Sequence, residues 1–107
     1  MWFKIRSSAR DESGDARRLS SIEQSISNAI ADAETEKKGL ARRLEGARAR
    51  ASVLLGNDVA EYQDRDPKSE QLLQQAEQDM IAGQKRINQL ATHIEHMGRV
   101  LDFLKQK

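Results

Sequence analysis

Two histidines near the C-terminus, His93 and His96, are the side chains best suited to metal chemistry. Their spacing would place both imidazoles on roughly one face of a helix. A metal site usually needs a third and a fourth ligand, and the Glu-x-x-His pairs of di-iron helical bundles are absent. The chain also contains no cysteine that could supply a thiolate. We therefore expect these histidines to lie on the surface or flank of a helix, with no metal and no cofactor.

A basic stretch in the first half of the chain is the best candidate for contact with a polyanion. It contains Lys37, Lys38, Arg42, Arg43, Arg48 and Arg50. No aromatic residues are interleaved with these bases, although single-stranded nucleic-acid sites use them for stacking. The net charge of the whole chain is only +1. We interpret the stretch as a solvated, ion-paired helix face, and nucleic-acid binding is the alternative.

No residue pattern typical of catalysis is present. The sequence contains no Ser-His-Asp arrangement, no glycine-rich phosphate loop and no paired-carboxylate signature. Gly39, Gly46 and Gly83 fit close packing between helices better than phosphate binding. We expect no catalytic residue and no enzymatic activity.

The elements that would position these residues are helices, and the clearest one lies near the C-terminus. Charged residues make up 33% of the chain and aromatic residues 4%, a composition typical of long helices. From residue 73 an apolar stripe recurs in alternating steps of three and four: Leu73, Ala76, Met80, Gly83, Ile87, Leu90, Ile94, Met97, Leu101 and Leu104. This a/d pattern predicts a helix that packs lengthwise along another helix. Because Asp66 can cap a helix and Pro67 suits the first helical position, we expect this helix over about 67–105.

A second helix is predicted over about 15–55. Its large apolar residues include Leu19, Ile22, Ile26, Ile30, Leu40 and Leu44. One row of apolar residues keeps a seven-residue spacing, but its companion shifts from Ile22 and Ala29 to Leu44 and Ala51. Such a drift follows 3.6 rather than 3.5 residues per turn. The pattern therefore predicts a bundle helix rather than a zipper strand.

The segments outside these helices are short. Residues 1–14 begin with an apolar cluster of Trp2, Phe3 and Ile5 and continue as a polar stretch that predicts a partly flexible linker. Asp15 or Ser13 is the expected N-cap, and Ser20 with Glu23 offers an alternative capping box. Gly56 is suited to end the first helix, so the connection is expected over about 56–66. Residues 57–65 allow either a helical extension or a separate turn.

Neither a signal peptide nor a membrane span is expected. Charged residues interrupt the N-terminal apolar cluster before a hydrophobic segment of sufficient length could form. No run approaches the roughly 20 apolar residues that a helix needs to cross a bilayer. The sequence therefore predicts a cytoplasmic protein.

Blocks of charge favour an antiparallel hairpin. Residues 19–35 hold three acidic residues and no basic one, a net charge of −3, and 36–50 hold six basic and two acidic residues, a net charge of +4. In the second half, 70–84 hold three acidic residues and no basic one, whereas 85–107 hold five basic and two acidic residues. Reversing the chain near residue 61 places each block opposite one of unlike charge. The blocks together favour this register, although each exposed pair contributes little.

The same register brings Leu40 near Gly83 and Leu19 near Leu104, and it carries the N-terminal apolar cluster toward Val100 and Phe103. A lone hairpin leaves much of its apolar surface in water, and this chain has no disulfide to compensate. We therefore expect two hairpins to form a four-helix bundle, most simply a homodimer, with a different helical protein as the rival partner.

Together these patterns predict an all-α fold with residues 15–107 as one helical hairpin. The expected function is that of a non-enzymatic interaction protein, a scaffold or adaptor, that self-associates through its a/d helix faces. A nucleic-acid-associated protein that uses residues 37–50 is the alternative.

Overall fold

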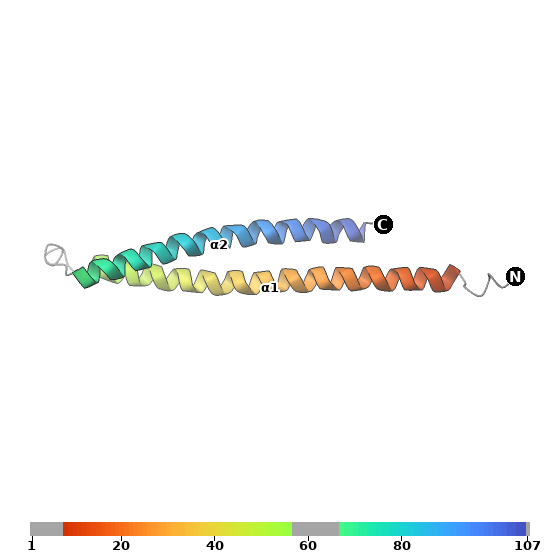
Figure 1. Cartoon of the computed structure of the whole chain (residues 1–107), viewed down its shortest axis with the longest axis horizontal. Coiled ribbons are helices and arrows are strands. Elements are labelled where there is room, and N and C mark those ends of the chain that lie inside the picture. The colour runs from red at the N-terminus through yellow and green to blue at the C-terminus, as the bar shows by residue number, and fades with distance from the viewer. Residues whose placement is uncertain (1–7, 57–66, 107) are drawn as a thin grey trace.

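The computed structural model describes residues 8–56 and 67–106, and nearly all of them belong to two long helices. Helix α1 spans Ser8–Gly56 and helix α2 spans Pro67–Lys105. The helices lie side by side and run antiparallel (Figure 1). At a rise of 1.5 Å per residue, the 49 residues of α1 make it about 74 Å long. The predicted all-α antiparallel hairpin is confirmed.

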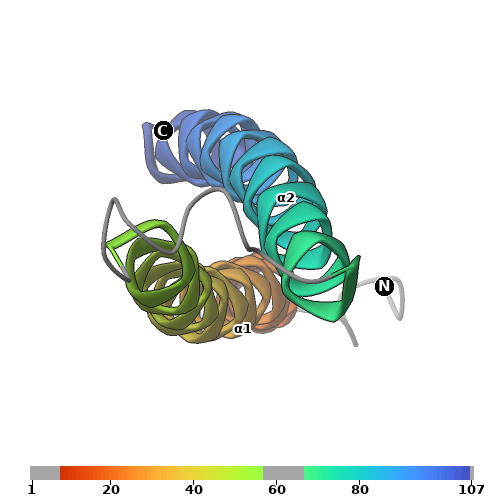
Figure 2. The same ribbon diagram turned by 90° about the vertical axis from the view of Figure 1, so that its left-hand side faces the viewer.

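The two helices wind around each other along their length (Figure 2). A seven-residue repeat drifts by about 20° per heptad on a straight helix, so helices must supercoil to keep such a repeat in contact. The winding therefore indicates that both helices use a seven-residue repeat. We call the line of contact between them the seam.

On α2, the seam is the stripe predicted from the sequence. Every residue of that stripe, from Leu73 to Leu104, is buried or half-buried. Apart from Ser69 and Gly98, all other described residues of α2 are exposed. The stripe therefore contains nearly all of the described α2 residues that are buried or half-buried.

On α1, the seam keeps a strict seven-residue repeat, so the predicted drift is wrong. The α1 seam residues are buried or half-buried and follow in steps of four and three: Leu19, Glu23, Ile26, Ile30, Ala33, Lys37, Leu40, Leu44, Ala47, Ala51 and Leu54. Ile22 and Ala29, assigned to this face by the drift, are exposed. An apolar pattern alone misses the repeat because it includes Glu23 and Lys37. Long charged side chains can lay their methylene groups along an apolar surface while the charge stays in water.

The start of α1 differs from the prediction. The helix begins at Ser8, so residues 8–14 are helical rather than a linker, and Asp15 lies inside the helix instead of capping it. Asp11 lies in the first turn, where a negative charge interacts favourably with the helix dipole. Asp15 accepts a hydrogen bond of 2.9 Å from Arg18. These interactions help to offset the roughly 1 kcal/mol that Gly14 costs inside a helix.

The other helix boundaries agree with the prediction. Helix α1 ends at Gly56, and α2 begins at Pro67 and ends at Lys105. Residues 57–66 and the N-terminal apolar cluster lie outside the described residues. The proposals for the connection and for packing of that cluster on Val100 and Phe103 therefore stay predictions.

Burial divides the hairpin into two halves. We call residues 33–56 and 67–90 the closed half, because it contains every buried residue of the described part of the chain: Ala33, Leu44, Ala47, Ala51, Leu73, Ala76 and Leu90. Residues 8–32 and 91–105 form the open half. Its seam residues Leu19, Glu23, Ile26, Ile30, Ile94, Met97, Leu101 and Leu104 are only half-buried. Figure 1 shows that α1 also extends beyond the C-terminal end of α2 in this half.

Candidate interaction surface

Small residues bring the two helices close together in the closed half. Ala51, Leu73 and Ala76 form the core cluster, with Leu54 and Met80 packed against it. Farther from the connection, Gly83 faces Leu44, whose Cδ1 would lie 3.8 Å from a Cβ on that glycine. The predicted neighbour of Gly83 was Leu40, one helical turn away, and both residues line the same groove. The predicted register is therefore accurate to about one turn here.

Two ion pairs link α1 to α2 on one side of the seam. Arg86 donates two hydrogen bonds to Glu36, from Nε to Oε2 at 2.9 Å and from Nη2 to Oε1 at 3.2 Å. Arg50 Nη2 lies 3.6 Å from Asp79 Oδ2. These four residues belong to two rows of seven-residue spacing beside the seam. We call the two rows the ion-pair flank, which consists of Ile22, Ala29, Glu36, Arg43 and Arg50 on α1 and of Leu72, Asp79, Arg86, His93 and Val100 on α2.

The Glu36–Arg86 pair shifts both ionisation equilibria toward the charged forms. The hydrogen bonds from Arg86 lower the pKa of Glu36, and the positive charges of Arg86 and Arg43 act in the same direction, while desolvation opposes them. The same carboxylate raises the pKa of Arg86. Because both side chains remain nearly half exposed, the pair adds little stability. Its bidentate geometry makes the contact between the two helices specific.

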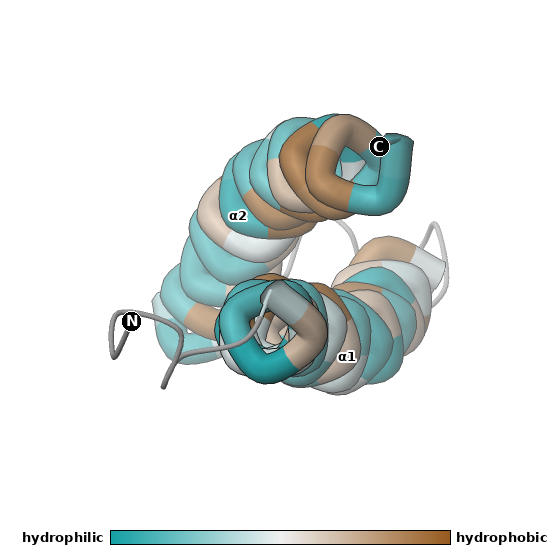
Figure 3. Tube along the Cα trace, turned by 90° about the vertical axis from the view of Figure 1, so that its right-hand side faces the viewer, coloured by the Kyte–Doolittle hydropathy of each residue, from teal (hydrophilic) through white to brown (hydrophobic). Residues whose placement is uncertain are grey.

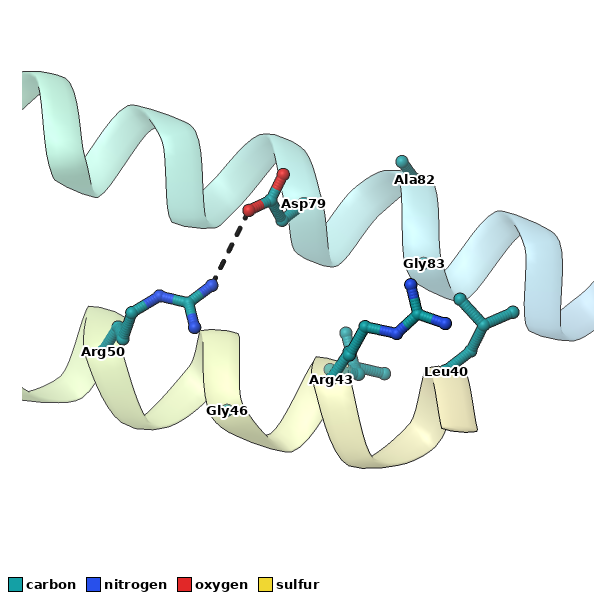
Figure 4. Close-up of a pocket in the computed structure, with 8 residues that line it drawn as sticks. Leu40, Arg43, Gly46, Arg50, Asp79, Ala82 and Gly83 are labelled. Atoms are coloured by element: carbon teal, nitrogen blue, oxygen red, sulfur yellow. Dashed lines mark ion pairs between the residues drawn. The ribbon is translucent and has the colours of Figure 1, made fainter. Parts of the chain in front are cut away.

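A groove of about 670 Å³ opens on the ion-pair flank in the closed half. Figure 4 shows Arg50 reaching toward Asp79 across it, and the Arg43 guanidinium directed toward α2. The lining residues are Leu40, Arg43, Leu44, Gly46, Arg50, Asp79, Ala82 and Gly83. Within the described part of the chain, Arg43 makes no ion pair. The groove therefore combines an apolar floor with the positive charge of Arg43 on its rim.

Both ends of the ion-pair flank are apolar. Ile22 is 48% exposed and Val100 is 40% exposed in the open half, and the adjacent Phe103 is 75% exposed. Leu72 is exposed at the opposite end. There it lines a second groove, of about 400 Å³, together with Ala49, Arg50, Val53, Leu54, Gln75 and Ala76. Figure 3 shows that hydrophobic residues of α2 lie near its C-terminal end.

The basic stretch does not form a single face. Successive residues of a helix are about 100° apart, so the six bases point in several directions. Lys37 lies in the seam, whereas Arg43 and Arg50 lie on the ion-pair flank. Arg48 lies on the opposite side of the seam from the ion-pair flank and forms an ion pair with Glu45 at 3.3 Å. This distribution reduces the positive potential that any one surface could offer to a polyanion.

The two histidines lie on the exposed side of α2. His93 and His96 line a shallow depression together with Arg86, Gln89, Thr92 and Arg99. Among the residues that the structure describes, no three side chains of His, Cys, Asp or Glu are grouped so that they could hold a metal ion. Two arginines beside the imidazoles also oppose the approach of a metal cation. The surface position predicted for both histidines agrees with their exposure.

Sequence reasoning missed the ion-pair flank as a surface. The rows beginning at Ile22 and Leu72 carry acidic and basic residues at seven-residue spacing, and these charges were the available signal. Positions beside an a/d seam often carry charges that set helix partner and orientation. Placing the two rows on one side of the hairpin required the correct α1 seam, which includes Glu23 and Lys37.

No helix in residues 8–56 or 67–106 is long and apolar enough to span a membrane. Comparisons of the chain with protein-family models, with curated proteins and with solved structures found no match.

Proposed function

We propose that the protein is a non-enzymatic helical scaffold or adaptor that acts by self-association. The observation that carries this proposal is the incomplete burial of the open half. Its seam contains large apolar residues that α1 and α2 cover only in part, and Ile22, Val100 and Phe103 are exposed beside them. Further helices would remove this surface from water.

The energetic argument rests on the limited core of a two-helix unit. Burial of apolar surface contributes about 25 cal/mol per Å², but each ordered residue costs roughly 1.5 kcal/mol of conformational entropy. A hairpin whose buried residues are confined to one half gains little from the first term. A second hairpin adds two helices to the same apolar face and gives a four-helix bundle, which is most simply a symmetric homodimer.

Sedimentation equilibrium at micromolar concentration tests this proposal directly. We expect a mass of about twice the 12.1 kDa of one chain, together with a fully helical circular dichroism spectrum. A folded species with the mass of one chain would contradict self-association. A heteromeric complex with another helical protein is the rival arrangement. It predicts that the isolated chain is monomeric.

A matched pair of substitutions shows which surface is used. Val100→Glu should weaken the dimer at least about tenfold, because it places a charge in an apolar contact. Ile81→Glu is the control, since Ile81 is 71% exposed but lies on the outward side of α2, away from the seam. Equal effects of the two substitutions would argue against a contact near Val100.

The nucleic-acid alternative receives less support from the arrangement of the basic stretch around α1. It predicts binding that weakens steeply with salt, because neutralised phosphates release counterions. A gel-shift titration with duplex and single-stranded DNA at two salt concentrations tests it. We expect no shift at micromolar protein concentration.

A further inference from the structure

We infer that the second copy docks on the ion-pair flank with both copies' Gly56 ends at the same end of the bundle, so that α1 of each copy packs on α2 of the other. This inference rests on the proposed self-association and specifies its surface and orientation. It places a two-fold axis along the length of the bundle. Every helix then has antiparallel neighbours, as in up-down-up-down bundles.

The choice of flank follows from the distribution of large apolar residues. The ion-pair flank exposes Ile22, Leu72 and Val100, and Phe103 adjoins it. The rows on the other side of the seam contain one large apolar residue, Leu55; they are Ser20, Ser27, Glu34, Ala41, Arg48 and Leu55 on α1 and Glu70, Glu77, Gln84, Ala91, Gly98 and Lys105 on α2. A face with apolar side chains at both ends can bury more apolar surface on association.

The choice of orientation follows from the pairing already present within one hairpin. A two-fold axis along the bundle leaves the position of each residue along the bundle axis unchanged; we call this position its height. The α1 row of one copy therefore meets the α2 row of the other copy much as the two rows meet within one chain. Glu36 then faces Arg86 of the other copy, because these residues pair within the hairpin. Counted in heptads from the Glu36–Arg86 pair, Ile22 faces Val100 at the apolar end.

Arg43 adds a second charge match. Its guanidinium makes no ion pair within the described part of its own chain, and it lies on the rim of the central groove (Figure 4). Asp79 is placed relative to Arg43 as Arg86 is placed relative to Glu36, three heptads from Val100 as Arg43 is from Ile22, although within the chain it pairs with Arg50, one heptad farther along α1. Its contact with Arg50 is long, at 3.6 Å. In the proposed dimer, Asp79 of the other copy forms an ion pair with Arg43.

The opposite orientation fits this flank less well. With the Gly56 ends at opposite ends of the bundle, α1 would pack on α1 and α2 on α2. When the rows of the two copies overlap completely, this orientation places Glu36 against Glu36 and Arg86 against Arg86, and Ile22 against Arg50. Like charges in contact are unfavourable, and a charge over an exposed isoleucine loses hydration without a partner. Charge complementarity therefore selects the same-end dimer.

Single-cysteine variants test the arrangement, because the chain has no cysteine of its own. Chains carrying Ile22→Cys are mixed with chains carrying Val100→Cys, unfolded, refolded together and oxidised gently. We expect a disulfide-linked heterodimer, identified by its intact mass. A mixture of Leu72→Cys with Val100→Cys reports the opposite orientation, and Ile81→Cys with Val100→Cys is the control for random collision. Neither of these mixtures should cross-link efficiently.

A charge exchange provides an independent test. Arg43→Glu should weaken dimerisation at least about tenfold, since it places two carboxylates together at each of the two equivalent contacts. Adding Asp79→Arg to the same chain should restore much of the loss. A folded single variant with unchanged dimerisation would overturn the proposed contact, and circular dichroism establishes that the variants remain helical.

The outcomes separate this inference from the proposed function. A dimer in sedimentation that cross-links through Leu72 and Val100, or through neither pair, overturns the same-end arrangement and leaves self-association intact. A monomer in sedimentation overturns self-association itself. A dimer that cross-links through Ile22 and Val100 supports both.

Discussion

The closed half and the open half of the hairpin share one seven-residue repeat but differ in the size of the residues that fill it. In the closed half, large seam residues such as Leu73 and Leu90 alternate with small ones such as Ala47 and Ala76, and members of both sizes are buried. In the open half, every apolar seam residue is a leucine, isoleucine or methionine, and none is fully buried.

This difference shows what two helices can accomplish without further partners. A pair of helices touches along one line, so it encloses a large side chain only where small residues opposite allow the backbones to approach. Where large residues face one another, their outer surfaces stay in contact with water. The closed half is therefore a self-sufficient packing unit, whereas the open half has the composition of a bundle that needs more helices.

The largest expected effect is in the closed half. Leu90→Ala should lower the free energy of unfolding by about 2–5 kcal/mol, because the side chain is only 2% exposed and its removal leaves a cavity. Urea unfolding followed by circular dichroism measures the loss. Leu55→Ala is the control at an exposed leucine and should change the free energy by less than about 1 kcal/mol. Comparable losses would contradict the burial described for the closed half.

Enlarging a small seam residue tests the close approach of the helices. Ala76 is 1% exposed, so Ala76→Leu must push the helices apart and should cost about 1–3 kcal/mol. Ala91→Leu inserts the same atoms at an exposed position of the same helix and should be nearly neutral. If Ala76→Leu were neutral as well, tight packing in the closed half would be disproved.

Substitutions at two glycines, one in each half, test how much space is available for an added methyl group. A Cβ at Gly98 in the open half meets no atom within 4 Å, and one at Gly83 in the closed half makes an ordinary contact with Leu44. Each Gly→Ala substitution should therefore raise the free energy of unfolding by about 0.5–1 kcal/mol, through the lower backbone entropy of the unfolded chain. Thermal melts measure the gain. A loss at Gly83 alone would mean that the closed half has no room for a methyl group.

The smallest effect concerns the ion pair near the junction of the two halves. The pKa of Glu36 is lowered in the folded state. Glu36 therefore stabilises the fold at pH values above the ordinary pKa of a carboxyl group, and this contribution is lost as the pH falls through the lowered pKa. Wild-type protein should therefore melt at a slightly higher temperature than Glu36→Gln near pH 7, and the two should melt alike near pH 2. A difference that persists in acid would show that the carboxylate charge is not the cause.

Much of the fold could be predicted from the sequence because it depends on local patterns. The stripe from Leu73 to Leu104, the start of α2 at Pro67 and the end of α1 near Gly56 follow from periodicity and from the preferences of helix ends. The start of α1 at Ser8 could not, because a polar segment that looks like a linker also has adequate helix propensity.

The candidate interaction surface depended on information that the sequence carries only indirectly. The sequence by itself determined that two helices form and that one apolar face of each is buried, because residue type and spacing decide those properties. Only the tertiary structure decided that Glu23 and Lys37 lie in the seam and that Glu36 meets Arg86. The physical reason is that the rotation of each helix about its axis minimises the free energy of the whole contact, so a charged residue can occupy a seam position when its neighbours gain more by burial.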